Sequence, residues 1–246
     1  MRYSAPVFRS PVIPRTVDLI HPRRAKPFHR PGWVYEEKYD GWRIVAFKDG
    51  SRVRLVSRRG RDHTARFPNV AAAIARLSPG TLILDGELCV FDSKLVSQFH
   101  LLMDPGAELA ELATPPVFMA FDCLRLRSRD LRPLALRDRR KALEDGIAGA
   151  QLVFPARRLE QDGLAAWTTV QERGYEGLVA KDERAPYNPA HPSAAWWKVK
   201  VRHEARASSS SGSRWPTRGR TRCSLLSAPG NSSPTAVAWN GALAVG

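Results

Sequence analysis

One short segment of the chain brings a lysine, three acidic residues and an arginine together around a glycine. Residues 36–43 read EEKYDGWR, so two glutamates precede Lys38, and Asp40, Gly41 and Arg43 follow it. A lysine that attacks phosphorus must be held, deprotonated and aimed, and charged neighbours of this kind suit that task. The alternative is a plain turn at Asp40 and Gly41 between two strands. The segment alone favours a nucleophilic lysine over the turn.

Five further motifs follow in order along the chain. They occupy residues 57–60 (SRRG), 84–88 (LDGEL), 120–124 (AFDCL), 176–181 (EGLVAK) and 197–200 (WKVK). Each has an ordinary interpretation when it is taken alone. Glu87 reads as a turn acid, Phe121 as a core residue, and Lys198 with Lys200 as the solvated face of a strand. One phosphoryl-transfer site accounts for all six motifs together.

In sequence and spacing this series, from about residue 33 to residue 203, resembles the adenylation domain of bacterial ATP-dependent DNA ligases. These enzymes are covalent nucleotidyltransferases, as are the RNA ligases and the mRNA capping enzymes. The resemblance implies that Lys38 attacks the α-phosphorus of ATP, expels pyrophosphate and carries AMP as a phosphoramidate. It also implies a nucleotidyltransferase (ATP-grasp-like) fold, with antiparallel sheets flanked by helices.

The resemblance assigns nucleotide contacts to further residues. Glu36 would contact the amino group of adenine, and Phe121 would stack on the base. Arg43 and Arg58 would hold the ribose and the phosphates, or the 5′-phosphate of a nick. Asp40 would orient the loop that presents the nucleophile.

The remaining implied roles concern the triphosphate and its metal ion. Glu87 would contact the ribose and, together with Glu176, a Mg²⁺ or Mn²⁺ ion. Two carboxylates are a minimal protein contribution for Mg²⁺, which also takes water and phosphate oxygens. Lys181, Lys198 and Lys200 would neutralise the triphosphate. Such cations stabilise the charge that develops on phosphates, and they ease the loss of a proton from a neighbouring lysine.

Periodicity predicts the elements that would position these residues. Alternating or β-branched runs predict strands over 33–38, 42–47, 52–57, 117–126, 177–181 and 196–201, with a hairpin turn at 48–51. Shorter strands at 81–84 and 88–91 flank an Asp-Gly-Glu turn. Helical spacing covers 67–77, 136–147 and 163–173. Hairpins mixed with helices indicate the α+β class.

Composition divides the chain into three parts. Residues 1–30 form a Pro/Arg-rich arm, residues 31–203 form the adenylation domain, and residues 204–246 form a Ser, Gly and Pro-rich tail that we expect to be disordered. Ligases of this family normally continue into an OB-type barrel, which needs about five strands. The abrupt break resembles a truncated gene with a shifted reading frame. We therefore expect weak or absent self-adenylation and poor nick sealing.

Bulk properties indicate the partners and the compartment. The formal net charge is +15 and the pI is about 10.5, which favours nucleic acid first and an anionic membrane surface second. Three sparse cysteines without metal-ligand spacing, no apolar run of membrane-span length and no signal peptide predict a cytoplasmic protein. The expected partners are ATP and nicked duplex DNA, and the expected state is a monomer.

The sequence thus predicts an ATP-dependent DNA ligase that seals nicks in DNA repair or recombination through a lysyl-AMP intermediate. Two alternatives remain open. The chain could be a catalytically impaired remnant that binds DNA or ATP without turnover. It could also be another ATP-dependent nucleotidyltransferase, such as an RNA ligase.

Overall fold

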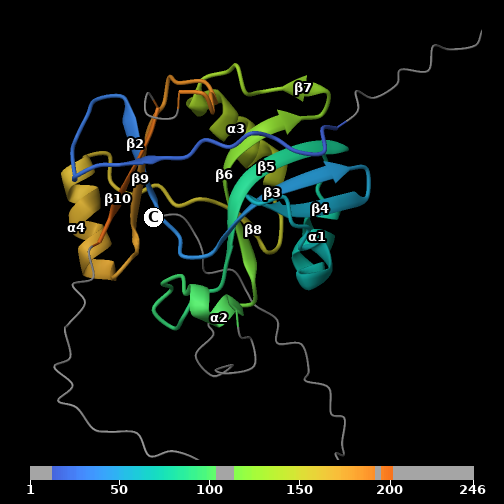
Figure 1. Ribbon diagram of the computed structural model, residues 1–246, viewed down its shortest axis with the longest axis horizontal. Coiled ribbons are helices and arrows are strands. Elements are labelled where there is room, and N and C mark those ends of the chain that lie inside the picture. The colour runs from blue at the N-terminus through green and yellow to red at the C-terminus, as the bar shows by residue number, and fades with distance from the viewer. Residues whose placement is uncertain (1–12, 104–113, 192–194, 202–246) are drawn as a thin grey trace, which may run out of the picture. The chain divides into compact units, whose positions relative to one another are not determined.

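The computed structural model describes residues 13–103, 114–191 and 195–201. Within these residues the strands form two sheets (Figure 1). The four-stranded sheet has the order β1-β10-β9-β2. The six-stranded sheet has the order β4-β3-β5-β6-β7, with β8 paired to β6. Most neighbours run antiparallel, whereas β1 with β10 and β6 with β8 are parallel pairs. Mixed sheets with few helices confirm the predicted α+β class.

The bounds of the elements are as follows. The strands are β1 (Arg23–Arg24), β2 (Trp33–Glu37), β3 (Trp42–Asp49), β4 (Arg52–Ser57), β5 (Thr81–Cys89), β6 (Val117–Leu126), β7 (Arg129–Asp130), β8 (Val153–Pro155), β9 (Gly177–Asp182) and β10 (Trp196–Lys200). The helices are α1 (Pro68–Ala75), α2 (Phe99–Met103), α3 (Leu136–Ile147) and α4 (Gly163–Arg173), with a 3₁₀ turn at Thr64–Arg66. No helix among the described residues is both long enough and apolar enough to cross a membrane.

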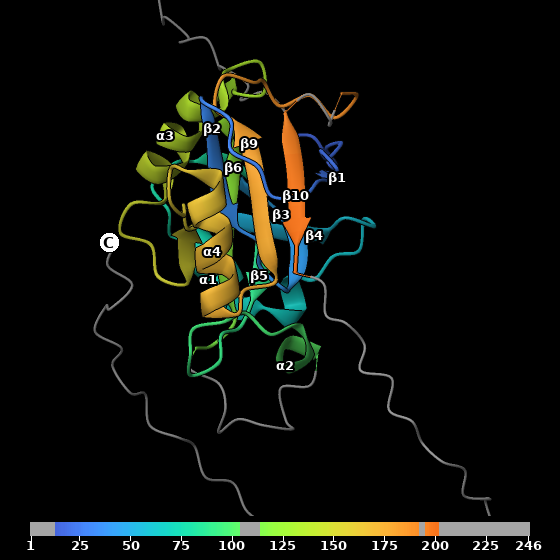
Figure 2. The ribbon, with the colours of Figure 1, turned by 90° about the vertical axis from the view of Figure 1, so that its left-hand side faces the viewer.

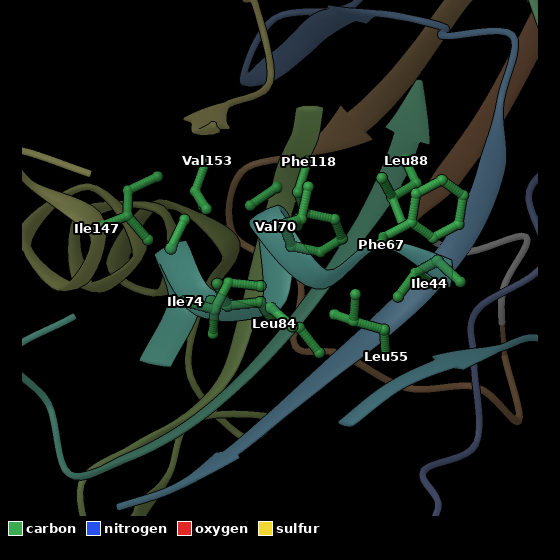
Figure 3. Close-up of a cluster of buried hydrophobic side chains, with 14 of the residues drawn as sticks. Ile44, Leu55, Phe67, Val70, Ile74, Leu84, Leu88, Phe118, Ile147 and Val153 are labelled. Carbon is green, nitrogen blue, oxygen red and sulfur yellow. The ribbon is translucent and has the colours of Figure 1, made fainter. Parts of the chain in front are cut away.

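The main core lies on one face of the six-stranded sheet (Figure 3). Strand alternation brings Ile44, Leu55 and Leu84 to this face, where α1 covers them. Val70 and Ile74 lie four residues apart on α1, which places both on its buried side. Burial of this apolar surface fixes β3, β4 and β5 as one rigid layer.

The four-stranded sheet is covered on one face by α4, which lies along β9 and β2 in Figure 2. Ala166 and Val170 of the helix pack against Tyr35 and Leu178 of the strands. The helix begins at Asp162, whose carboxylate accepts hydrogen bonds from two backbone N–H groups at 2.8 and 3.0 Å. It ends at Gly174, whose φ of 73° is the left-handed conformation that glycine adopts easily. This face is closed, so only the opposite face can contribute to a cleft.

The second faces of the two sheets meet each other. Phe47 and Ile83 of the six-stranded sheet pack in one buried cluster with Trp196 of β10 and with Tyr187, which precedes that strand. Side chains on these faces therefore point into the space between the sheets. Alternation along β2 and β9 places Glu36 and Lys181 on the same inner face.

The described part of the N-terminal arm packs into this domain. Ile20 is fully buried, its N–H donates to Tyr187 Oη at 3.3 Å, and its carbonyl accepts from Arg43 Nη1 at 2.6 Å. Residues Arg23–Arg24 then form β1 beside β10. Residues 20–24 therefore pack against the domain that the sequence predicts to begin at residue 31. Prolines exclude a helix here, but they do not prevent an extended segment from lying across a sheet. Residues 1–12 and the predicted disordered tail lie outside the described residues.

Other predicted elements match closely, with one instructive exception. Strands 52–57 and 117–126 and helices 136–147 and 163–173 have the predicted bounds. The expected Asp-Gly-Glu turn is wrong, because β5 runs through it without interruption. A Cβ at Gly86 would lie 2.5 Å from the Phe118 ring and 2.7 Å from the Met119 carbonyl oxygen. The glycine thus permits close approach of β6 and does not mark a turn.

A buried ion pair fastens α3 to the six-stranded sheet. Arg139 of α3 donates Nε and Nη2 to the two carboxylate oxygens of Asp122 at 2.7 and 2.8 Å. Both side chains are fully buried. The Arg139 Nη1 group also donates to the carbonyl of Leu134 at 2.6 Å and to that of Ala185 at 3.0 Å. The bidentate geometry satisfies both charges.

We expect Arg139→Met to lower the free energy of unfolding by about 3–5 kcal/mol, because the buried carboxylate of Asp122 loses its partner. Urea denaturation at pH 7, followed by circular dichroism, measures this change. Arg137→Met is the matched control, since Arg137 is exposed on the same helix. Its effect should stay within about 0.5 kcal/mol. Equal losses in the two variants would contradict a structural role for the ion pair.

Candidate functional site

A cleft of about 210 Å³ lies between the inner faces of the two sheets. Eight of the ten predicted site residues line it: Glu36, Lys38, Arg43, Arg58, Glu87, Phe121, Lys181 and Lys198. The other two, Glu176 and Lys200, join it through ion pairs. Six further residues line the cleft that the sequence did not identify as site residues, namely His21, Pro22, Glu37, Tyr39, Val179 and Trp196. The structure therefore gathers the predicted set from all six motifs.

The backbone around Lys38 is held from both sides. The Lys38 N–H donates to the Gly177 carbonyl at 3.0 Å, which ties the end of β2 to β9. The carboxylate of Asp40 accepts a hydrogen bond from the Phe99 N–H at 3.3 Å. The backbone N–H of Asp40 donates to Ser97 Oγ at 2.8 Å. These contacts support the expectation that Asp40 orients the loop.

Gly41 has a steric role in the same loop. A Cβ at this position would lie 2.3 Å from the carbonyl oxygen of Leu88 in β5. No side chain fits there, so the glycine lets the loop after the lysine approach β5. The Lys-x-Asp-Gly spacing therefore serves to seat Lys38 against the six-stranded sheet.

The ammonium group of Lys38 is paired with the carboxylate of Glu176. The other oxygen of the same carboxylate binds the ammonium group of Lys200. Glu176 thus bridges two lysines from two different motifs. The side chains of Lys38 and Glu176 are each 21% exposed, so the bridge lies at the edge of the cleft and remains accessible to a ligand.

Glu87 lies on β5 directly opposite Arg43 in the strand register. Burial raises the pKa of its carboxyl to about 8, against the opposing influence of Lys38 and Arg43. Asp85 and Glu176 raise the pKa further. The described residues contain no group of three or more His, Cys, Asp or Glu side chains that could hold a metal ion by themselves. Two neighbouring carboxylates fit an ion that takes its other ligands from phosphate and water.

Arg43 is largely occupied by the protein itself. Its Nε and Nη2 groups donate to the two oxygens of Asp85 at 3.0 and 2.7 Å, and Nη1 donates to the Ile20 carbonyl at 2.6 Å. Asp85 is fully buried and also accepts from Tyr187 Oη at 2.7 Å. The sequence reasoning missed this partner, although Asp85 and Glu87 lie two apart on one strand. Arg43 therefore joins three segments at the cleft wall.

One end of the cleft is aromatic and holds a buried ion pair. Lys181 Nζ lies 2.5 Å from Glu36 Oε2, 4.1 Å from the centroid of the Trp196 ring and 4.7 Å from that of Phe121. Burial lowers the pKa of Lys181, while Glu36 opposes this shift. The Phe121 and Trp196 rings meet edge to face at 5.9 Å. An aromatic wall of this kind suits a flat ring system.

Lys181 lies away from Lys200, one of the two lysines with which it was expected to neutralise the triphosphate. In the register of β9 with β10, Lys181 lies opposite Trp196, whereas Gly177 lies opposite Lys200. Four residues of strand separate these positions, a distance of roughly 13 Å. The alternation of side chains along a strand predicts on which face of the sheet a lysine lies. It does not predict which part of a bound ligand that lysine contacts.

The mouth of the cleft is strongly cationic. Burial lowers the pKa of Lys198, and Lys200, Lys38, Arg24 and Arg58 lower it further. Burial together with Arg43, Arg58 and Lys198 likewise lowers the pKa of His21. Neighbouring positive charges repel one another, and a bound anion would reduce this repulsion. The arrangement is suited to a group that carries several negative charges.

Comparison with known proteins decides the family. Residues 19–200 match the family model described as the ATP dependent DNA ligase domain. The chain belongs to this family. It is 37% identical over 168 residues to the multifunctional non-homologous end joining DNA repair protein LigD of Mycobacterium tuberculosis, covering 68% of this chain and 21% of that protein. It is 34% identical over 186 residues to a probable DNA ligase of Streptomyces avermitilis, covering 68% of this chain and 35% of that protein.

Solved structures agree with the family assignment. The ligase domain from M. tuberculosis LigD matches with a TM-score of 0.65 and 32% identity, over 76% of this chain and 61% of that chain. A mycobacterial DNA ligase D complexed with ATP and MES matches with a TM-score of 0.62 and 34% identity, over 74% and 58% of the two chains. This chain therefore spans only part of the length of each of these relatives.

Glu37, which also lines the cleft, is a buried carboxyl that the sequence reasoning did not assign to the site. It is 3% exposed, and neither of its carboxylate oxygens has a hydrogen-bond partner among the described residues. Arg157 Nη1 lies 3.3 Å from Oε2 and is its ion-pair partner. Burial raises the pKa of Glu37 to about 7, and Arg157 opposes the shift. Glu37 directly precedes Lys38 in the chain.

The raised pKa of Glu37 predicts a dependence of stability on pH. The folded state holds this proton more tightly than the unfolded state, whose value is near 4.5. The stabilisation is fully present below that pH and is lost as the pH rises toward about 7. We expect the loss to approach about 3 kcal/mol, from 2.303RT per pH unit. Glu37→Gln should remove this term, so the variant becomes more stable than the wild type at pH 8.

Urea denaturation of both proteins at pH 4.5 and pH 8 measures the effect as a difference between the two pH values. Other titrating groups then cancel, because they are present in both proteins. Glu172→Gln is the control, since Glu172 is exposed on α4. An identical pH dependence in the wild type and Glu37→Gln would show that the Glu37 carboxyl is not protonated at neutral pH.

Proposed function

We propose that this chain is the adenylation domain of an ATP-dependent DNA ligase, which accepts AMP covalently on Lys38 and serves nick sealing in DNA repair. The observation that carries the proposal is the placement of Lys38. Its ammonium group lies in a cleft with an aromatic end and a cationic mouth, and it is paired with Glu176. A nucleotide that spans this cleft would place its phosphates beside the lysine.

In this proposal the base of ATP enters the aromatic end of the cleft. Phe121 and Trp196 supply the apolar wall, and Glu36 supplies an acceptor for an amino group. Lys181 stays paired with Glu36 and so belongs to the base end. This replaces the earlier expectation that Lys181 neutralises phosphate.

The triphosphate would lie toward Lys38. Arg58 and Lys198 line that part of the cleft, and Lys200 reaches it through Glu176. Fixed cations stabilise the charge that develops on phosphate oxygens during transfer. Mg²⁺, when bound, would add a Lewis acid beside the phosphates. Glu87 and Glu176 would hold this ion.

The chemical step is the attack of the neutral Lys38 amine on the α-phosphorus. A nitrogen–phosphorus bond forms while the bond from phosphorus to the pyrophosphate oxygen breaks. The proton that Lys38 must lose has a nearby acceptor in Glu176, whose carboxylate contacts the ammonium group. Neighbouring cations at the mouth favour this loss, because they disfavour a second positive charge.

Incubation of the purified chain with α-labelled ATP and Mg²⁺ tests the proposal. Because we expect self-adenylation to be weak, we expect only a small fraction of the protein to take up label in an acid-labile bond, and Lys38→Ala to abolish that labelling. Lys141→Ala is the matched control, because Lys141 is exposed on α3 away from the cleft lining, and it should label like the wild type. Undiminished labelling of Lys38→Ala, or failure of the wild type to bind and incorporate ATP, would refute the proposal.

DNA binding should depend steeply on salt. If arginines and lysines neutralise backbone phosphates, the logarithm of the affinity for nicked duplex falls linearly with the logarithm of salt, with a slope near −0.9 for each neutralised phosphate. Arg58→Met should weaken binding and reduce the slope by about one. Fluorescence anisotropy with a nicked hairpin measures both quantities.

The control for this measurement is Arg129→Met. Arg129 is exposed on β7, at the opposite edge of the six-stranded sheet from β4, which Arg58 follows. Its slope should match that of the wild type. An affinity that hardly changes with salt in all three proteins would exclude an electrostatic contact with the DNA backbone.

A further inference from the structure

Glu36 lies between two cations that come from different parts of the fold. Its Oε2 atom is 2.5 Å from Lys181 Nζ of β9, and its Oε1 atom is 3.6 Å from Arg140 Nη1 of α3. Glu36 is 1% exposed and Arg140 is 7% exposed. Arg140 belongs to none of the six motifs, and it does not line the cleft. It reaches the cleft only through Glu36.

Two buried polar atoms at this point lack a hydrogen bond. Among the described residues, neither Glu36 Oε1 nor Arg140 Nη1 has a partner. An unpaired buried acceptor is costly, so a ligand that brings a donor to Oε1 gains a full hydrogen bond there. Lys181 occupies the other oxygen, so Oε1, which faces Arg140, is the oxygen with capacity to accept a further hydrogen bond.

Arg140 is itself firmly held. Its Nε donates to Glu144 Oε1 at 2.6 Å, one helical turn further along α3. The preceding residue, Arg139, fixes the same helix turn to β6 through Asp122. A chain of alternating charge thus runs from Glu144 through Arg140 and Glu36 to Lys181. It gives the Glu36 carboxylate a fixed orientation.

We propose that Arg140 is a positioning residue, which holds Glu36 so that Oε1 accepts a hydrogen bond from the amino group of a 6-amino purine and disfavours a 6-oxo purine. The inference rests on the proposed function, because it assumes that the base occupies the aromatic end of the cleft. A carboxylate only accepts hydrogen bonds. An amino group at position 6 donates to it, whereas a carbonyl at the same position sets two acceptors against each other.

Nucleotide binding, measured by titration calorimetry with ATP and with inosine triphosphate, tests the proposal without requiring chemistry. The two ligands differ only at position 6 of the base and its neighbouring ring proton. The proteins are the full chain, Arg140→Met, and Lys141→Met as the matched control on the exposed side of the same helix. We expect Arg140→Met to lower the ratio of ATP to inosine triphosphate affinity by about tenfold, the effect of one charge-assisted hydrogen bond.

The loss should appear mainly as weaker ATP binding, and Lys141→Met should keep the wild-type ratio. Arg140→Lys retains a cation with a shorter reach, and it should give an intermediate ratio. This variant also decides the question if Arg140→Met does not fold. Weaker binding of both nucleotides with an unchanged ratio would mean that Arg140 only braces the fold, and this would overturn the inference alone. A wild-type chain that binds neither nucleotide would overturn the proposed function as well.

Discussion

Buried charge has to be neutralised, and in this chain each neutralising pair joins segments that are far apart in the sequence. Arg43 pairs with Asp85, Arg139 with Asp122, and Lys181 with Glu36. Removing one member of such a pair leaves an uncompensated charge, which costs far more than an exposed ion pair contributes. The pairs therefore fix how β2, β3, β5, β6, β9 and α3 meet. The ion pair of Arg140 in α3 with Glu36 in β2 adds a link between the two layers, and the cleft lies between them.

The ion pairs along the cleft differ in exposure, and this divides the cleft into a rigid end and an exchangeable end. The side chains of Lys181 and Glu36 are each 2% exposed, those of Lys38 and Glu176 are each 21% exposed, and that of Lys200 is 37% exposed. An exposed ion pair is worth roughly 0–1 kcal/mol, so a polyanion can displace Glu176 from its lysines at little cost. The Lys181 pair cannot separate so easily. The aromatic end is thus built in advance, whereas the end that holds Lys38 has ion pairs that a ligand can displace.

The sequence predicted faces and elements better than partners. Alternation located β4 and β6, and helical spacing located α3 and α4, because a buried stripe leaves a local signal. The motif residues gathered as expected because they were identified as a set. Asp85 could not be recognised as the partner of Arg43, because the two residues are 42 positions apart in the sequence and meet only when their strands pair. Gly86 was predicted to lie in a turn for a similar reason. The close approach of Phe118, which requires a glycine there, is a tertiary contact that the local sequence does not reveal. Short elements such as β8 have too few residues to show a period.

The same reasoning explains why Lys38, the proposed nucleophile, lies at the end of a strand and not within it. In the middle of β2 each side chain is committed, alternately, to the α4 face or to the inner face. Lys38 follows the last residue of β2, where the backbone is tied to Gly177 and the loop is pressed against β5 at Gly41. The backbone is therefore fixed by both sheets. Because Lys38 lies beyond the end of the strand, its side chain does not have to point to one of the two faces of the sheet, as the side chains within β2 do. A lysine that must exchange a carboxylate partner for a phosphorus atom needs this combination of a fixed origin and a movable tip.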